Sequence, residues 1–141
     1  MWTRTYSKTF KNIKKETIWQ LWTDVNNWPT WQEDLDYCKL EGAFSVGNHF
    51  MLKPKGVKAF KIELTEIEDE RKFTDCTTFF GAKMYDTNEL EETKEGLRLT
   101  STLKVTGPLR FLWGKLVAQN VAHSAPQQME ALVEQARSHV I

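Results

Sequence analysis

The alternation of apolar and polar side chains predicts that most of this chain forms a β-sheet. In the first segment, Trp2 to Phe10, all three aromatic residues occupy even positions, which is the period of a strand. From Leu35 to Thr106, short alternating segments are separated by Gly, Pro and charged turns, a pattern typical of an antiparallel meander. We expect six strands there: Tyr37 to Glu41, His49 to Lys53, Phe60 to Ile67, Lys72 to Phe79, Met84 to Thr93 and Leu97 to Thr106.

Helical spacing of apolar residues occurs in two places, one on each side of this meander. The first helical segment begins just after Asn12, which we expect to cap it, and ends before Pro29. The second begins at Gly107-Pro108 and continues toward the C-terminus. We expect Pro126 to kink or interrupt this long helix near Ser124, because proline lacks the N–H that a helix interior needs.

This order of elements predicts one α+β domain over residues 1–141. A seven-stranded curved antiparallel sheet wraps around a long C-terminal helix, with short helices between strands one and two. Five of the six tryptophans lie within the first 31 residues, and we expect these side chains to plug the core. A single helix cannot fill a sheet that curls around it unless large side chains close both ends, so we also expect a cavity.

The last two strands predict polar side chains inside this cavity. A two-residue turn at Glu95-Gly96 gives the pairs Lys94 with Leu97, Leu90 with Ser101 and Asn88 with Leu103. On this register Asp86, Asn88 and Ser101 point inward among apolar neighbours, where they need hydrogen-bond partners. Two alternatives stay open: these residues bind one another through trapped water, or they bind the polar groups of a ligand.

The preceding predicted strand is ambiguous in its facing. Phe73, Asp75, Thr77 and Phe79 share one face, and Thr74, Cys76, Thr78 and Phe80 share the other. Both faces contain apolar and polar residues, so periodicity does not decide which face is inward.

Charge and composition exclude several classes of partner. Nineteen basic and nineteen acidic residues give no net charge, so nucleic acid is not an expected partner. We expect no stable membrane insertion, because the apolar runs are short, and the N-terminal segment lacks the apolar core of a signal peptide. We therefore expect a cytoplasmic protein, with Cys38 and Cys76 as buried free thiols.

Catalytic and metal-binding motifs are not found in the sequence. His49 is expected at the surface, and His123 and His139 have no carboxylate or second histidine at ligand spacing. We therefore expect no metal and no cofactor. Asp86 with Asn88 is a candidate acid–base pair if the pocket raises the pKa of the aspartate.

Three groups of residues together carry a family resemblance. They are Trp28-Pro29-Thr30-Trp31; Leu40-Glu41-Gly42 followed by Val46-Gly47 and the Phe50 strand; and Gly96-Leu97-Arg98-Leu99-Thr100 followed by Thr106-Gly107-Pro108-Leu109. Through them the chain resembles the START-like, or SRPBCC, superfamily with its helix-grip fold, and within it the polyketide cyclase/dehydrase-like and lipid-transport-like branch. The resemblance implies an internal cavity that accepts an apolar or amphipathic small molecule.

Matching positions then give the candidate ligand-binding residues. The resemblance implies that Trp31, Phe50, Phe79, Met84, Asn88, Ser101, Leu103, Trp113 and Val117 line the pocket, and the inward register adds Asp86. Our first hypothesis is a monomer or weak homodimer that binds a small hydrophobic or amphipathic ligand, lipid-like or polycyclic aromatic, without catalysis. The alternatives are a polyketide cyclase/dehydratase-type enzyme with Asp86 as its acid–base group, and a protein-interaction module with a filled core.

Overall fold

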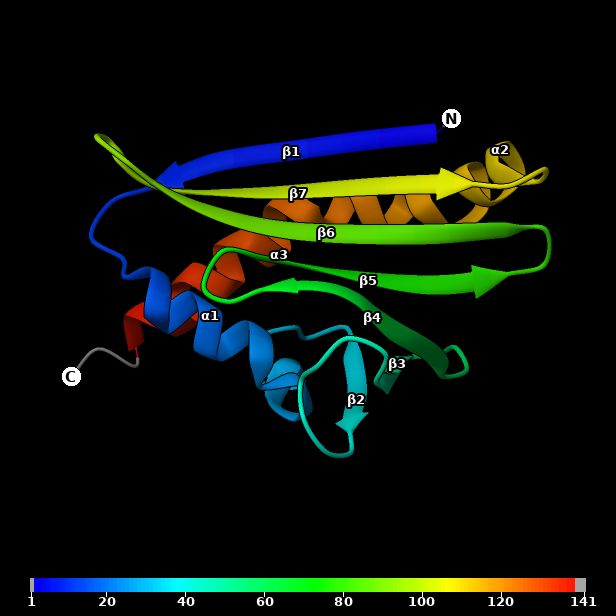
Figure 1. Cartoon of the computed structure of the whole chain (residues 1–141), viewed down its shortest axis with the longest axis horizontal. Coiled ribbons are helices and arrows are strands. Elements are labelled where there is room, and N and C mark those ends of the chain that lie inside the picture. Colours follow the sequence, from blue (N-terminus) through cyan, green and yellow to red (C-terminus); the bar gives the residue numbers. More distant parts are fainter. Residues whose placement is uncertain (1, 139–141) are drawn as a thin grey trace.

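The computed structural model describes residues 2–138 and contains one seven-stranded antiparallel sheet and a long C-terminal helix (Figure 1). The strands are β1 (Trp2–Phe10), β2 (Leu35–Leu40), β3 (His49–Pro54), β4 (Phe60–Glu68), β5 (Lys72–Phe79), β6 (Ala82–Thr93) and β7 (Gly96–Thr106). The helical elements are α1 (Lys15–Thr23), the 3-10 helix η1 (Val25–Thr30), α2 (Arg110–Trp113), the π-helix η2 (Gly114–Ala118) and α3 (Gln119–Ser138). The predicted fold class is confirmed.

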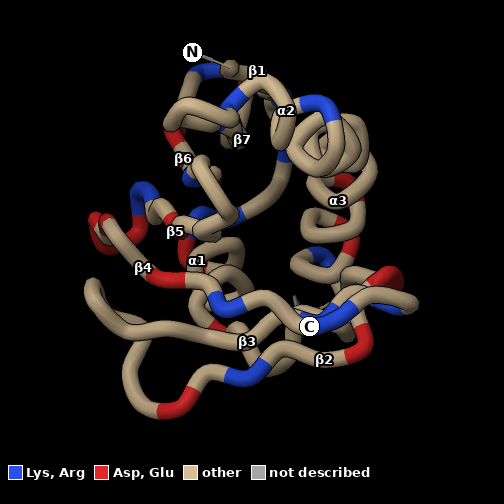
Figure 2. Tube along the Cα trace, turned by 90° about the vertical axis from the view of Figure 1, so that its right-hand side faces the viewer, with Lys and Arg blue, Asp and Glu red and all other residues tan. Residues whose placement is uncertain are grey.

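The sheet curves around α3, as the view along the strands shows (Figure 2). Its order is β1-β7-β6-β5-β4-β3-β2, so the first strand pairs with the last and all other neighbours are consecutive in the chain. This order places β6, β5 and β4 at the centre of the sheet. Within residues 2–138, no helix is long and apolar enough to cross a membrane.

The predicted strand bounds agree with the structure to within two residues at each end. The bounds of β1 and β5 are confirmed without change. The predicted cap at Asn12 is wrong: Asn12 adopts φ 60° in the turn after β1, and α1 begins at Lys15 with Lys14 in the cap position. Asparagine tolerates this left-handed conformation, so it serves the turn and not the helix.

The register of β6 and β7 differs from the prediction by two residues. Thr93 pairs with Gly96, which makes Lys94 and Glu95 the turn residues, and Asn88 pairs with Ser101 in place of Leu103. Because side chains alternate with period two, a shift of two residues leaves every side chain on its predicted face. Asp86, Asn88 and Ser101 are therefore on the inward face, as the sequence predicted.

The C-terminal helix is irregular at a different place from the one predicted. The chain forms a π-helical turn at Gly114–Ala118 and then runs as α3 without interruption through Pro126. The predicted interruption near Ser124 does not occur, and the helix packs against the sheet on both sides of the proline. His139 lies outside the described residues.

Two hydrophobic clusters hold the helix. One cluster contains Ala118, with Val121 and Ala122 packed against it, and joins the start of the helix to Trp2 and Val105. The larger cluster lies toward the other end of the helix and buries, among others, Met129, Leu132, Val133 and Ala136 together with Phe10, Ile18 and Leu99. The helix is thus anchored to the sheet at both ends.

Aromatic rings close the fold at the larger cluster. Phe73 on β5 is 1% exposed, and its ring centroid lies 5.4 Å from those of Trp22 and Phe44 and 6.4 Å from those of Trp19 and Trp28. Most of these contacts are edge-to-face, an arrangement that adds to the energy of burial. Of the five tryptophans predicted to plug the core, Trp19, Trp22 and Trp28 lie in this cluster and Trp31 packs against it, whereas Trp2 belongs to the other cluster.

The backbone comes close to Gly81 at Gly107, where the chain enters the C-terminal helix, and substitution tests this close approach. Gly107 has φ 104°, and a Cβ atom added there would lie 2.6 Å from the carbonyl oxygen of Gly81. Gly56 has φ 80° but nothing within 4 Å of the same added atom. We expect Gly107→Ala to lower the free energy of unfolding by about 3 kcal/mol and Gly56→Ala by about 1 kcal/mol, as measured by urea titration. Equal losses would contradict the close approach at Gly107.

Candidate functional site

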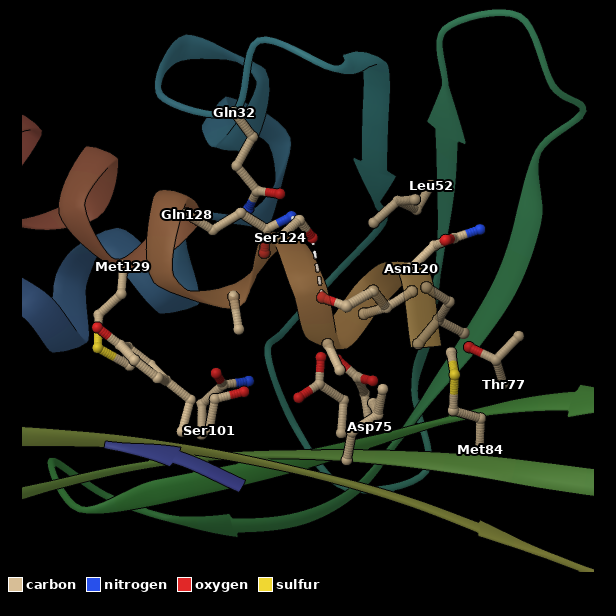
Figure 3. Close-up of a pocket in the computed structure, with 18 of the residues that line it drawn as sticks. Gln32, Leu52, Asp75, Thr77, Met84, Ser101, Asn120, Ser124, Gln128 and Met129 are labelled. Atoms are coloured by element: carbon tan, nitrogen blue, oxygen red, sulfur yellow. Dashed lines mark hydrogen bonds between the residues drawn. The ribbon is translucent and has the colours of Figure 1, made fainter. Parts of the chain in front are cut away.

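A cavity of about 560 Å³ lies between the inward face of the sheet and α3 (Figure 3). Its residues come from all seven strands, α1, η1, the segment after η1, η2 and α3. The apolar part of the lining includes Trp22, Trp28, Trp31, Leu35, Leu52, Phe60, Ile62, Phe73, Phe79, Met84, Leu99, Leu103, Val117, Val121, Met129 and Leu132. The cavity is therefore walled mostly by aromatic and aliphatic side chains, as small-molecule sites usually are.

A row of polar side chains crosses the sheet face of this cavity. In the strand register Asp75 lies opposite Asp86, and Asn88 lies opposite Ser101, which in turn lies opposite Tyr6 of β1. Side chains directly opposite on antiparallel strands share a face, so the register brings these residues together. The structure thus decides what periodicity left open: the Phe73, Asp75, Thr77 and Phe79 face of β5 is the inward one.

Asp75 is buried, and Asp86 is half-buried with one enclosed carboxyl oxygen. Asp75 is 8% exposed, and the Oδ1 atom of Asp86 is buried with no hydrogen-bond partner among residues 2–138. Burial raises the pKa of Asp86 to about 6. Burial, and then the negative charge of Asp86, raise the pKa of Asp75 well above its usual range. Both carboxyls therefore hold a proton more readily than an exposed aspartate does.

The helix adds polar groups on the opposite side of the cavity (Figure 3). The hydroxyl of Ser124 donates to the carbonyl of Val121 at 2.8 Å, and Nε2 of Gln128 donates to that hydroxyl at 3.4 Å. Asn120 and His123 also line the cavity and are exposed. These side chains are one helical turn apart, so they form a polar stripe on α3 between its two apolar anchors.

The structure brings together eight of the ten predicted site residues. Trp31, Phe79, Met84, Asp86, Asn88, Ser101, Leu103 and Val117 line the cavity. Whether any of them contacts a ligand stays a prediction.

Phe50 and Trp113 are not among the lining residues. Phe50 is 1% exposed, with its ring 5.2 Å from that of Trp28, so it belongs to the core. Trp113 stacks on Phe79 with 4.6 Å between the ring centroids, and its Nε1 donates to the carbonyl oxygen of Phe80 at 2.7 Å. It therefore supports a wall of the cavity from behind.

Several lining residues were missed by sequence reasoning, above all Asp75. Its strand is buried from Phe73 to Thr77 on both faces, so its sequence carried no signal of facing. The opposition of Asp75 and Asp86 follows only once β5 is paired with β6. The helix stripe was missed because its residues are ordinary exposed polar side chains in the sequence.

Cys38 and Cys76 are not among the residues that line the cavity. Cys38 and Cys76 are free and buried, as predicted, and burial raises the pKa of Cys38 to about 12. Within residues 2–138, no three His, Cys, Asp or Glu side chains gather where they could hold a metal ion.

The architecture and the cavity together define a helix-grip fold with an internal cavity. The polyketide cyclase/dehydrase and lipid transport family matches residues 1–137. The chain therefore belongs to this family, and the resemblance inferred from the sequence is confirmed. None of the curated proteins matches the sequence significantly.

Solved structures share the fold at low sequence identity. Protein MLL2253 from Mesorhizobium loti is 18% identical, with a TM-score of 0.73 over 99% of both chains. The hypothetical protein jhp0584 from Helicobacter pylori is 12% identical, with a TM-score of 0.76 over 95% of this chain and 87% of that one. Norcoclaurine synthase from Thalictrum flavum, in complex with dopamine and hydroxybenzaldehyde, is 12% identical, with a TM-score of 0.73 over 99% of this chain and 90% of that one.

The pH dependence of stability tests the electrostatics of the aspartate pair. The pKa of Asp86 in the folded protein is about 6, which is above the usual value for an aspartate. The folded state therefore binds a proton at Asp86 more tightly than the unfolded state does, and the stability gained from this proton is lost as the pH rises through about 6. We expect Asp86→Asn to be more stable than the wild type by roughly 2 kcal/mol at about pH 7.5, and by much less at about pH 4, in urea titrations.

The exposed turn residue Asp69 supplies the matched control, since Asp69→Asn should leave stability unchanged at both pH values. An Asp86→Asn protein that is equally destabilised at both pH values would contradict this account.

Proposed function

We propose that this protein binds a small amphipathic molecule in the cavity between the sheet and α3. The apolar body of the ligand contacts the aromatic and aliphatic walls, and its polar group meets the row that contains Asp75, Asp86, Asn88 and Ser101. The observation that carries the proposal is that Asp86 lines this apolar cavity while its enclosed Oδ1 atom has no hydrogen-bond partner among residues 2–138. Buried polar atoms are nearly always satisfied, so a ligand is the natural source of the missing hydrogen bond.

The balance of the lining supports this division of roles. Burial of apolar surface contributes about 25 cal/mol per Å², so contact with the walls supplies most of the affinity. The polar row contributes less energy but fixes orientation, because a ligand that leaves these groups unpaired carries the cost of their desolvation. A cavity of about 560 Å³ is within the range typical of small-molecule sites.

The same volume argues against the filled-core alternative. That alternative would dock through the charged side chains near the chain start and on the β6–β7 hairpin, and several of these are paired within the chain. Lys8 pairs with Glu130, Arg98 pairs with Glu91, and Lys15 pairs with Glu92 at 3.4 Å. These charges therefore have partners of their own on the surface.

A cavity-filling variant tests the proposal. Val117 lines the cavity from η2, whereas Lys115 on the same turn is exposed and does not line it. The neutral fluorophore N-phenyl-1-naphthylamine should bind the wild type, because its two apolar ring systems match the walls. We expect Val117→Trp to weaken its binding by about tenfold or more, and Lys115→Trp to leave it unchanged, in fluorescence titrations.

Met84→Trp, on the sheet side of the cavity, provides a second blocking variant if Val117→Trp does not fold, as judged by circular dichroism. Binding that is unchanged in a folded blocking variant would overturn the proposal, since the probe would then be held elsewhere.

A further inference from the structure

We propose that the cavity selects an amphipathic amine, whose protonated ammonium group binds between Asp75 and Asp86 while its apolar body contacts the walls. This inference rests on the proposed function and names the chemical class of its ligand. Three features carry it: the opposed aspartates, the absence among residues 2–138 of a cation that pairs with them, and the apolar surroundings.

The strand register places the two carboxyl groups together. Asp75 and Asp86 are direct partners across β5 and β6, and both line the cavity. Residues directly opposite on antiparallel strands have Cβ atoms about 5 Å apart, so a small group can contact both carboxyls at once. Figure 3 shows Asp75 rising from the sheet toward α3, into the space that a ligand would fill.

The pair has no cationic partner within the described chain. Eight ion pairs form among residues 2–138, and neither aspartate takes part in any of them. More than nine-tenths of Asp75 is buried, and Oδ1 of Asp86 has no hydrogen-bond partner among residues 2–138. Buried carboxylates are otherwise paired with cations or metal ions, so this site lacks the partner that its chemistry requires.

The other titratable residues that line the cavity do not supply this partner. They are Arg4 and Tyr6 from β1, Asp34 from the segment after η1, and His123 from α3. The guanidinium of Arg4 donates to the Thr3 carbonyl at 2.9 Å and lies 4.6 Å from the centroid of the Trp2 ring. Arg4 and His123 are exposed, Asp34 is itself acidic, and Tyr6 supplies a phenol and not a cation.

An ammonium group fits this site better than a neutral group or a metal ion. It carries three N–H donors and one positive charge, so it compensates the ionised carboxylate and hydrogen-bonds both aspartates. A hydroxyl group supplies one donor and no charge, which leaves the buried carboxylate uncompensated. The site lacks a third acidic, His or Cys ligand within residues 2–138, so a metal ion would be poorly held.

Matched pairs of probes test the inference on the full chain. Tryptamine and tryptophol share one ring system, as octylamine and octanol share one alkyl chain, and the members of each pair differ only in ammonium against hydroxyl. We expect each amine to bind about tenfold or more tightly than its alcohol at about pH 7.5, measured by isothermal titration calorimetry, because charge-assisted hydrogen bonds are the stronger ones.

Two isosteric variants locate the source of this preference. Asp75→Asn and Asp86→Asn should each reduce the preference for the amine to about threefold or less while alcohol binding persists, because the apolar walls are unchanged. Asp69→Asn, in an exposed turn away from the cavity, should retain the full preference. A preference that survives in both cavity variants would overturn the inference.

Lowering the pH tests the wild-type protein without substitution. The amines stay protonated below about pH 9, so only the protein titrates when the pH falls from about 7.5 to about 5. Since burial raises the pKa of Asp86 to about 6, the preference for the amine should disappear over this range while alcohol binding stays constant.

The outcomes separate the two proposals. Alcohols that bind as tightly as their amines at about pH 7.5 would overturn the amine inference and leave the proposed function standing. If neither member of either pair binds, the proposed function is contradicted, and the inference falls with it.

Discussion

The helix α3 is held to the sheet at its two ends and not in its middle, and this constraint creates the cavity. Near its start, Ala118 packs with Trp2 and Val105, and Gly114 lies so close to Trp2 that an added Cβ would be 2.6 Å from the indole Cδ1 atom. Toward its end, Met129 and the residues that follow it pack into the aromatic cluster around Phe73. The large side chains of that cluster keep the sheet and the helix apart. The helical turns between the two clusters therefore do not fill the space between α3 and the sheet.

This arrangement explains why polar groups accumulate inside an otherwise apolar site. On β5 a single face begins with Phe73 in the aromatic cluster and continues with Asp75, Thr77 and Phe79 along the cavity. The aspartate is thus held by a strand that the core already fixes, and β6 sets Asp86 opposite it. Placing both carboxyl groups in this apolar site lowers the stability of the empty protein. A ligand that pairs with them recovers this free energy when it binds.

The sequence predicted the fold well because the patterns that specify it are local. Aromatic alternation placed β1, the charged turns divided the meander, and the period of two kept Asp86, Asn88 and Ser101 on the correct face despite a register error of two residues. The site was predicted less completely. Asp75 lies on a strand buried on both faces, Trp113 and Phe50 are large apolar residues whose role depends on packing, and a π-turn at Gly114–Ala118 has no sequence signature. Pro126 continues the helix because tertiary packing outweighs one lost hydrogen bond.

Native mass spectrometry of the protein purified from its own host tests the central claim most directly, that the space beneath α3 is a ligand-binding site. The account predicts a complex of one chain with one small molecule, which is released on denaturation and is missing when Val117→Trp is purified in the same way. Denaturing extraction then identifies the chemical class of the released molecule. A wild-type protein that has the mass of the bare chain, and that keeps this mass after incubation with lipids, amphipathic amines and polycyclic aromatic compounds, would contradict the account.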